Sequence, residues 1–309
     1  CPVPEPKDHE ILMKVEYVGM CGSDIHGFEF GPFLPPKDPN QKIGLGHEVA
    51  GEVVKIGAKV TKFKVGDKVL IEPGVPDDTC EYCRTGRYNI CPGVDFMATQ
   101  PNYKGALTQY MTHPEEWTYH IPEGMTTMEG ALVEPAAVGM HAAVLGGAQP
   151  GKSIVILGGG TIGLMVLQAC ISLGATDITV VDVIEKRLEL AKKLGAARVI
   201  NGKEEDTVAV LRSEEMYGDH GVDLVFEAAG AVFTAQQAVQ IVSRGGKIMM
   251  VGTQSKPVPI DFLKINREVT IQTSFRYCNN FPQTIEAISS GRFNVKDMVT
   301  NIYDYEDVQ

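Results

Sequence analysis

The sequence lacks several features that mark other classes of protein. No segment is apolar over the ~18 positions that a membrane helix needs, and no run of lysines and arginines forms a basic patch. Its 39 acidic and 28 basic residues give a net charge of −11, which repels nucleic-acid phosphates and anionic lipids. We therefore expect a soluble protein whose partners include neither nucleic acid nor a membrane surface.

The distribution of cysteines also argues against a disulfide framework. The seven cysteines are an odd number spread over 309 residues, and no signal peptide is apparent. This favours a reducing, cytoplasmic setting in which cysteines serve as ligands or core residues. The chain opens in a Pro-rich stretch and stops shortly after Tyr305, so we expect both ends to be cut.

The length predicts two domains. Short strand-like runs separated by Gly and Pro extend from Ile11 to about Pro122, for example EVAGEVVKI, and are typical of an irregular β-rich domain. From Ser153 strands and helices alternate, which predicts an α/β unit with a doubly wound parallel sheet of six strands. We place the β-rich catalytic domain at 1–136, with 278–309 returning to it, and the Rossmann domain at 137–277.

A dinucleotide-binding turn follows the first strand of the α/β unit. Residues 158–163, GGGTIG, fit G-x-G-x-x-G at the start of a helix, where glycines admit the pyrophosphate and the helix N-terminus attracts it. Asp182 ends the next strand, 19 positions after Gly163, where an acid binds ribose hydroxyls and favours NAD over NADP. Arg187 is either a ribose or phosphate contact or a solvated helix residue. The alternative for the whole motif is a glycine turn in another kind of α/β protein.

The β-rich domain carries metal-ligand side chains. CGSDIH begins at Cys21, and GLGHE brings His47 and Glu48. Thiol, imidazole and carboxylate suit zinc, which in a catalytic site keeps one position open and can polarise an alcohol oxygen. Taken singly, a cysteine such as Cys21 is more often a small buried residue and a histidine such as His47 more often a core residue, and spacing does not decide between these interpretations.

In these motifs the sequence resembles the zinc-dependent medium-chain dehydrogenase/reductase family. CGSDIH, GLGHE, VGDKV, GGGTIG and FRYCN occur in its order, and IEPGVP, GRYNICP and VEPAAVGMHAA resemble its polyol dehydrogenases. The resemblance implies a GroES-like catalytic domain, and Cys21, His47 and Glu48 as zinc ligands. It implies that Glu134 binds the zinc or its water and meets substrate, and that Arg276 and Tyr277 meet substrate and cofactor. The expected cofactor contacts are Gly158, Gly160, Ile162, Gly163, Asp182, Arg187, Val251, Gly252, Thr253 and Arg276.

Two proton routes stay open. Ser23 can accept the alcohol proton and pass it through the ribose to His26, or Glu134 can do this work through water. Asp24 is either the acceptor that orients a ligand imidazole or an ordinary turn residue.

A second cluster has ligand spacing. Cys80, Cys83 and Cys91 match three of the four cysteines in the family's structural zinc lobe, and Asp77 stands where the first would be. Four such side chains can close a tetrahedral zinc site, and the alternative is a loop with free thiols.

The sequence thus predicts an NAD- and zinc-dependent enzyme that oxidises a secondary alcohol of a sugar alcohol, such as sorbitol, xylitol or galactitol, to a ketose. One alternative is another secondary alcohol, such as 2,3-butanediol or threonine. An alternative of a different class is a non-catalytic, crystallin-like dinucleotide-binding protein. The resemblance also implies a homo-oligomer, either a dimer or a tetramer.

Overall fold

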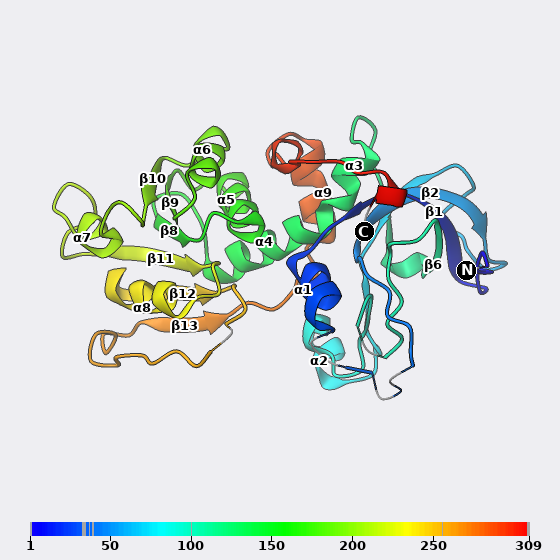
Figure 1. The fold of residues 1–309 in the computed structure, drawn as a ribbon, viewed down its shortest axis with the longest axis horizontal. Helices are drawn as coiled ribbons and strands as arrows, with labels where there is room; N and C mark the ends of the chain where they lie inside the picture. Colours follow the sequence, from blue (N-terminus) through cyan, green and yellow to red (C-terminus); the bar gives the residue numbers. More distant parts are fainter. Residues whose placement is uncertain are drawn as a thin grey trace. The chain divides into compact units, whose positions relative to one another are not determined.

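The computed structural model describes residues 2–32, 35–36, 38, 40–99, 101–254 and 256–307. The chain divides into two compact units (Figure 1). The first comprises residues 1–134 and 278–289, and the second comprises residues 135–277 and 290–309.

An antiparallel five-stranded sheet, in the order β6-β1-β2-β3-β7, forms the framework of the first unit. Ile11 and Met13 are two positions apart in β1, so their side chains lie on one face, and both are fully buried with Val49, Val53 and Val69. The strands of this unit are β1 (Glu10–Gly19), β2 (Glu48–Ile56), β3 (Lys68–Ile71), β6 (Tyr110–Pro114), β7 (Thr118–His120) and the small antiparallel pair β4 (Gly74–Val75) and β5 (Asp95–Phe96).

Short helices occupy the connections of the first unit. They are α1 (Gly22–Phe30), α2 (Glu81–Arg84), η1 (Tyr88–Ile90), η2 (Glu115–Trp117), α3 (Thr127–Ala131) and α9 (Phe281–Ser289). The start of α3 is fixed by a capping box, because Thr126 accepts from the Glu129 N–H and the Glu129 carboxylate accepts from the Thr126 N–H. The next helix, α4 (Val133–Gly146), begins in the first unit and continues in the second.

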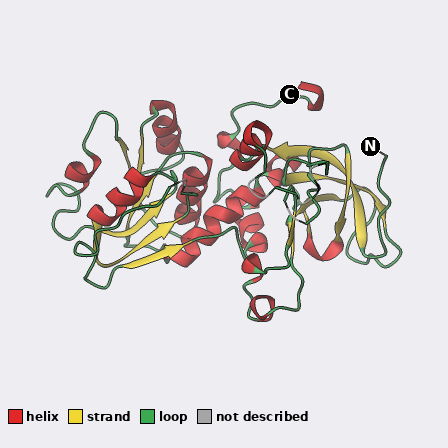
Figure 2. Ribbon diagram, turned by 60° about the horizontal axis from the view of Figure 1, so that its bottom comes forward, coloured by secondary structure: helices red, strands yellow, loops and turns green. Residues whose placement is uncertain are grey.

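A parallel six-stranded sheet, in the order β10-β9-β8-β11-β12-β13, forms the second unit (Figure 2, yellow). Its strands are β8 (Ser153–Leu157), β9 (Asp177–Asp182), β10 (Arg198–Asn201), β11 (Val222–Glu227), β12 (Val242–Met250) and β13 (Thr270–Thr273). Its further helices are α5 (Thr161–Ser172), α6 (Glu185–Lys193), α7 (Thr207–Leu211), α8 (Val232–Ile241), η3 (Lys296–Met298) and η4 (Tyr305–Asp307).

The central strands of this sheet are apolar and almost entirely buried, as parallel strands covered on both faces are. Ile154, Val155, Ile156 and Leu157 of β8 are all completely inaccessible. The predicted fold class, a doubly wound parallel sheet together with a β-rich GroES-like domain, is confirmed. Among the described residues, no helix has both the length and the apolar character that crossing a bilayer requires.

The C-terminal segment differs from the prediction that 278–309 returns to the first domain. Only 278–289 groups with the first unit, whereas 290–309 groups with the second. The Asn294 N–H donates to the side-chain oxygen of Gln168 on α5 at 2.8 Å, and Lys193 on α6 pairs with Asp297 at 3.2 Å. These contacts hold the segment against helices of the second unit.

Candidate active site and cofactor-binding residues

Cys21, His47 and Glu48 come together at one end of the β1–β2 pair. Glu48 is the first residue of β2 and lies opposite Gly19, the last residue of β1, in the antiparallel register. Cys21 lies two residues after the end of β1, and His47 directly precedes β2. Each side chain offers one ligand atom, and these atoms all lie within 4.8 Å of one another. Strand pairing therefore joins residues that are 26 and 27 positions apart.

Gly19 makes room for the Glu48 carboxylate. A Cβ atom at position 19 would lie 2.0 Å from Glu48 Oε2, closer than real Cβ contacts come. Sequence reasoning missed this residue. The sequence signal that could have revealed Gly19 is a glycine at the end of a strand-like run, two residues before a predicted metal ligand.

Asp24 ties together the two backbone segments that carry the ligands. Its Oδ2 accepts from the Cys21 N–H at 3.1 Å, and its Oδ1 accepts from the Gly46 N–H at 2.7 Å. Oδ2 also lies 3.7 Å from His47 Nδ1, which has no hydrogen-bond partner among the described residues. We assign Nδ1 to the side of Asp24, which leaves Nε2 for a metal ion.

Charge is unbalanced at this site. Burial opposes ionisation of Cys21, but His47 and the hydrogen bonds of Ser23 outweigh it, so the pKa of the thiol is lowered. Burial disfavours the His47 cation, yet Asp24, Cys21 and the charge of Glu134 raise its pKa to about 11. Burial and the charges of Glu134 and Cys21 raise the pKa of Glu48 well above its usual value.

The shifts at His47 and Glu48 both reflect the neighbouring acidic groups. The charges of Glu134 and Cys21 favour the His47 cation and disfavour the Glu48 carboxylate. A divalent cation bound among sulfur, nitrogen and oxygen donors would remove that repulsion. Zinc is the metal that this donor set suits. The residues present therefore fit a catalytic zinc ion.

Glu134, Ser23 and His26 lie in the same unit as the three ligands. Glu134 is buried in the first turn of α4, and its charge reaches both His47 and Glu48, although it is not a member of the three-residue group. Ser23 lies in the first turn of α1 and hydrogen-bonds to Cys21. His26 lies further along α1, with its ring centroid 5.3 Å from that of Phe30. Their assignment to proton transfer stays a prediction.

The loop from Asp77 to Cys91 brings a second set of ligands together. One ligand atom from each of Asp77, Cys80, Cys83 and Cys91 lies within 4.8 Å of all the others, and the cysteines are free. Hydrogen bonds from the Thr79 and Cys80 N–H groups lower the pKa of the Asp77 carboxyl to about 2. Three thiols and an ionised carboxylate at this spacing fit a structural zinc ion. We call this segment, residues 77–91, the Cys-rich loop.

The glycine-rich turn takes the form that dinucleotide binding requires. A Cβ at Gly163 would lie 1.8 Å from the Gly158 carbonyl oxygen, and Gly158 itself has a left-handed φ of 108°. The buried Asp182 carboxylate accepts from the Gly159 N–H at 2.7 Å, and Arg187 Nη1 lies 3.5 Å from it. The acid at the end of β9 thus lies directly beside the turn that precedes α5, which carries Ile162.

A buried carboxylate that sequence reasoning missed organises the neighbouring loops. Glu227, at the end of β11, accepts from Gly230 N–H at 2.9 Å and from the Gln254 side chain at 2.7 Å. Its backbone oxygen accepts from the Val251 and Gly252 N–H groups, so it fixes the loop that includes Thr253. The sequence signal that could have revealed Glu227 is an acidic residue at the carboxyl end of an apolar, strand-like run.

Arg276 and Tyr277 end the first segment of the second unit, residues 135–277. Arg276 has a left-handed φ of 52°, and its guanidinium lies 4.8 Å from the centroid of the Phe275 ring. Their contacts with substrate and cofactor stay a prediction.

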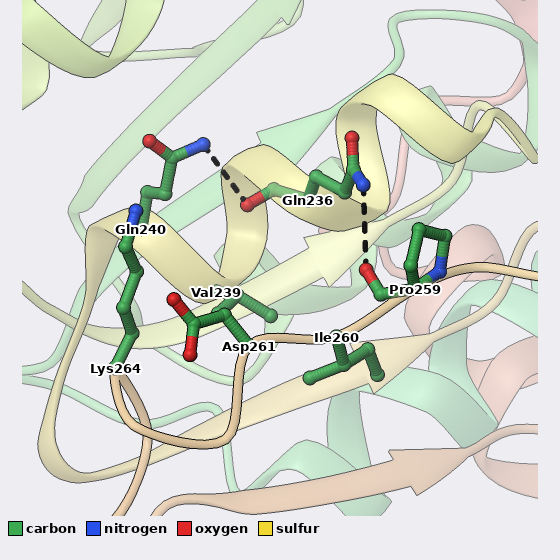
Figure 3. A pocket seen from close by; sticks show the side chains of 7 residues that line it. All are labelled: Gln236, Val239, Gln240, Pro259, Ile260, Asp261 and Lys264. Carbon is green, nitrogen blue, oxygen red and sulfur yellow. Dashed lines mark hydrogen bonds between the residues drawn. The ribbon is translucent and has the colours of Figure 1, made fainter.

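A small cavity of about 150 Å³ lies elsewhere in the second unit (Figure 3). In it, Gln236 of α8 donates to the Pro259 carbonyl at 3.3 Å. A drug-sized ligand needs roughly 300–1,000 Å³, and none of the predicted site residues lines this cavity. We assign it no role.

Comparisons with known proteins find relatives over nearly the whole chain. The alcohol dehydrogenase GroES-like domain matches residues 7–123, and the zinc-binding dehydrogenase domain matches residues 161–290. The uncharacterized zinc-type alcohol dehydrogenase-like protein YdjJ of Escherichia coli K12 is 67% identical over 99% of this chain and 88% of its own length. Sorbitol dehydrogenase of Bacillus subtilis is 41% identical over 100% of this chain and 87% of its own length.

A crystal structure shows the same likeness. An oxidoreductase of unknown specificity from Escherichia coli superimposes with a TM-score of 0.98 at 66% identity, over 100% of this chain and 88% of that one. The chain therefore belongs to the zinc-containing alcohol dehydrogenases of the medium-chain dehydrogenase/reductase family.

Proposed function

We propose that this enzyme oxidises a secondary alcohol of a sugar alcohol to a ketose and transfers the hydride to NAD. The observation that carries the proposal is the group of Cys21, His47 and Glu48, of which His47 and Glu48 are buried, together with the acid at the end of β9. The 41% identity to a sorbitol dehydrogenase supports the polyol class, because it extends over the whole chain.

The protein's own residues divide the work. Cys21, His47 and Glu48 would hold zinc, which supplies Lewis acidity at the alcohol oxygen when bound. Asp24 holds the two ligand-bearing segments at fixed spacing. Ser23 with His26, or Glu134, removes the alcohol proton, and the two routes are separable by mutation.

The choice of NAD rests on Asp182. Its carboxylate is buried beside the glycine-rich turn, where it would accept hydrogen bonds from ribose hydroxyls and repel a 2′-phosphate. Arg187 lies 3.5 Å from that carboxylate and partly neutralises it, so we expect a preference for NAD rather than complete exclusion of NADP.

Several hydrogen-bonding groups favour a substrate with many hydroxyls. Glu134 offers a carboxylate and Arg276 a guanidinium, and we propose that they, with Tyr277, bind hydroxyls next to the one oxidised. An isolated alcohol would use fewer of these groups and bind less tightly.

The deciding experiment measures reduction of NAD and NADP with a panel of alcohols on zinc-loaded protein. We expect turnover with sorbitol, xylitol or galactitol to exceed that with 2,3-butanediol and threonine, and NAD to be preferred. The reverse order among the alcohols would reject the polyol proposal. Turnover with none of them, and no change when zinc is removed, would favour the non-catalytic dinucleotide-binding alternative.

Matched variants separate the two proton routes. Ser23→Ala removes the hydroxyl, whereas Glu134→Gln keeps the size of the side chain and removes its charge. The variant that disables proton removal should lose about 10²- to 10⁴-fold in turnover and lose the pH dependence of kcat. If both keep full turnover and zinc content, neither residue is the base.

A further inference from the structure

One buried carboxylate of the first unit has no part in the proposed reaction. Glu72, which follows β3, is completely inaccessible. Its Oε1 accepts from the Tyr88 hydroxyl at 2.7 Å and its Oε2 from the Tyr119 hydroxyl at 3.0 Å. Its backbone oxygen lies 3.0 Å from His113 Nε2. A buried carboxylate with a partner on each oxygen fixes the positions of those partners.

Tyr88 extends this network into the Cys-rich loop. It lies in η1, between Cys83 and Cys91, so two predicted metal ligands hold the segment that carries it. Its ring packs edge-on against Trp117, with centroids 5.0 Å apart. While the hydroxyl of Tyr88 donates to Glu72, its oxygen accepts from the Asn279 N–H at 2.8 Å.

The same loop holds the segment that re-enters the first unit. Both Cys278 Sγ and Asn279 Nδ2 donate to the Gly86 carbonyl, at 3.0 Å and 2.7 Å. With the bond to Tyr88, three hydrogen bonds fix residues 278–279 to the Cys-rich loop. Asn279 also has a left-handed φ of 58°, a conformation that Asn tolerates better than most residues.

Chain geometry links this anchor to the predicted substrate residues. Arg276 and Tyr277 precede Asn279 by three and two positions, and a chain extends at most ~3.6 Å per residue. The Cα atom of Arg276 therefore stays within about 11 Å of the anchored residue.

We propose that Tyr88, a residue of the Cys-rich loop whose hydroxyl donates to Glu72, is a positioning residue. It anchors Asn279 and thereby sets the placement of Arg276 and Tyr277. The Cys-rich loop then serves substrate binding as well as stability. The part that concerns Arg276 and Tyr277 rests on the proposed function, whereas the anchoring of Asn279 does not.

The first test follows the Asn279 amide by hydrogen exchange in the zinc-loaded protein. Tyr88→Phe removes the acceptor, and we expect exchange of that amide to accelerate about 10-fold, as loss of one hydrogen bond allows. Tyr82→Phe is the matched control, because it makes the same change at a 38%-exposed tyrosine of the same loop. Equal exchange in Tyr88→Phe and Tyr82→Phe would overturn the anchoring.

The second test separates positioning from general stability. In Tyr88→Phe we expect KM for the alcohol to rise about 10-fold while kcat changes less than 2-fold and zinc content is unchanged, as loss of ground-state binding predicts. Asn279→Gly, which keeps the left-handed φ and removes the side-chain hydrogen bonds to Gly86 and Cys278, should raise KM in the same direction. If exchange at Asn279 is faster but KM is unchanged, Tyr88 anchors Asn279 but this anchoring has no role in substrate binding.

Discussion

The two ligand groups of the first unit differ in how they are built. Cys21, His47 and Glu48 are joined by strand pairing, and His47 and Glu48 are only 7% and 5% exposed. The Cys-rich loop takes its four ligands from 15 consecutive residues, and all but Cys91 are partly or fully exposed.

This difference changes what a bound ion does for the protein. In the first group, burial and the charges of Glu134 and Cys21 raise the pKa of Glu48. In the Cys-rich loop, backbone N–H groups stabilise the ionised Asp77, whose pKa is lowered. Glu48 would therefore ionise more readily beside a bound cation, whereas the backbone already holds Asp77 in its ionised form.

The largest expected effect is the difference in turnover between two variants, each of which lacks one predicted ligand of one group. Cys21→Ala should lower turnover by more than about 100-fold, the upper end for loss of a supporting partner, because a direct ligand is removed. Cys83→Ala should lose one zinc per chain and keep kcat within about 2-fold. Metal analysis and steady-state kinetics on both variants check this, and equal losses of kcat would contradict the division of roles.

A single methyl group tests the strand-built site. Gly19→Ala places a Cβ 2.0 Å from Glu48 Oε2 and should reduce zinc affinity or activity roughly 10- to 100-fold by displacing that carboxylate. Gly22→Ala is the matched control, because a Cβ at Gly22 meets nothing within 4 Å. If the two variants bind zinc equally well, Glu48 is not held as described.

The Cys-rich loop should release its metal first. Its ligands are reached by solvent, so a chelator should remove one zinc at least about 10-fold faster than the other, and Asp77→Ala should widen that difference. Asp77→Cys replaces the carboxylate with the thiolate that zinc prefers and should narrow it. Time-resolved zinc release with a colorimetric chelator measures both, and release of two ions at one rate would contradict the comparison.

The last prediction concerns stability rather than catalysis and rests on the buried His113. Burial lowers the pKa of His113 to about 4, so the unfolded chain binds a proton here that the folded chain refuses. The stability that this residue contributes is present above about pH 6.5 and falls by about 3 kcal/mol as pH drops to 4.

His113→Gln keeps a donor near the Glu72 carbonyl and cannot be protonated. Urea unfolding at pH 7.5 and pH 4.5 should show that the variant loses less stability on acidification than the unsubstituted protein. Parallel pH dependence in the two proteins would show that His113 does not stay neutral in the folded state.

The sequence was most informative where chemistry is local. Strands such as β8 and β11 contain short apolar runs, and the glycines of residues 158–163 together with Asp182 define the turn and the acid that accompanies it. The Cys-rich loop could be predicted for the same reason, since its ligands lie close along the chain. The end of the chain was predicted less well, because contacts such as that of Asn294 with Gln168 leave no periodic signal.

By itself, therefore, the sequence determined the fold class and the family and predicted the candidate ligand side chains, because periodicity, spacing and residue chemistry are all written along the chain. Only the tertiary structure decided that Gly19 must lack a side chain and that Glu72 joins Tyr88 to Tyr119. The same holds for the grouping of residues 290–309 with the second unit. Each of these depends on atoms brought together by strand register or packing, and that proximity has no counterpart in the order of residues.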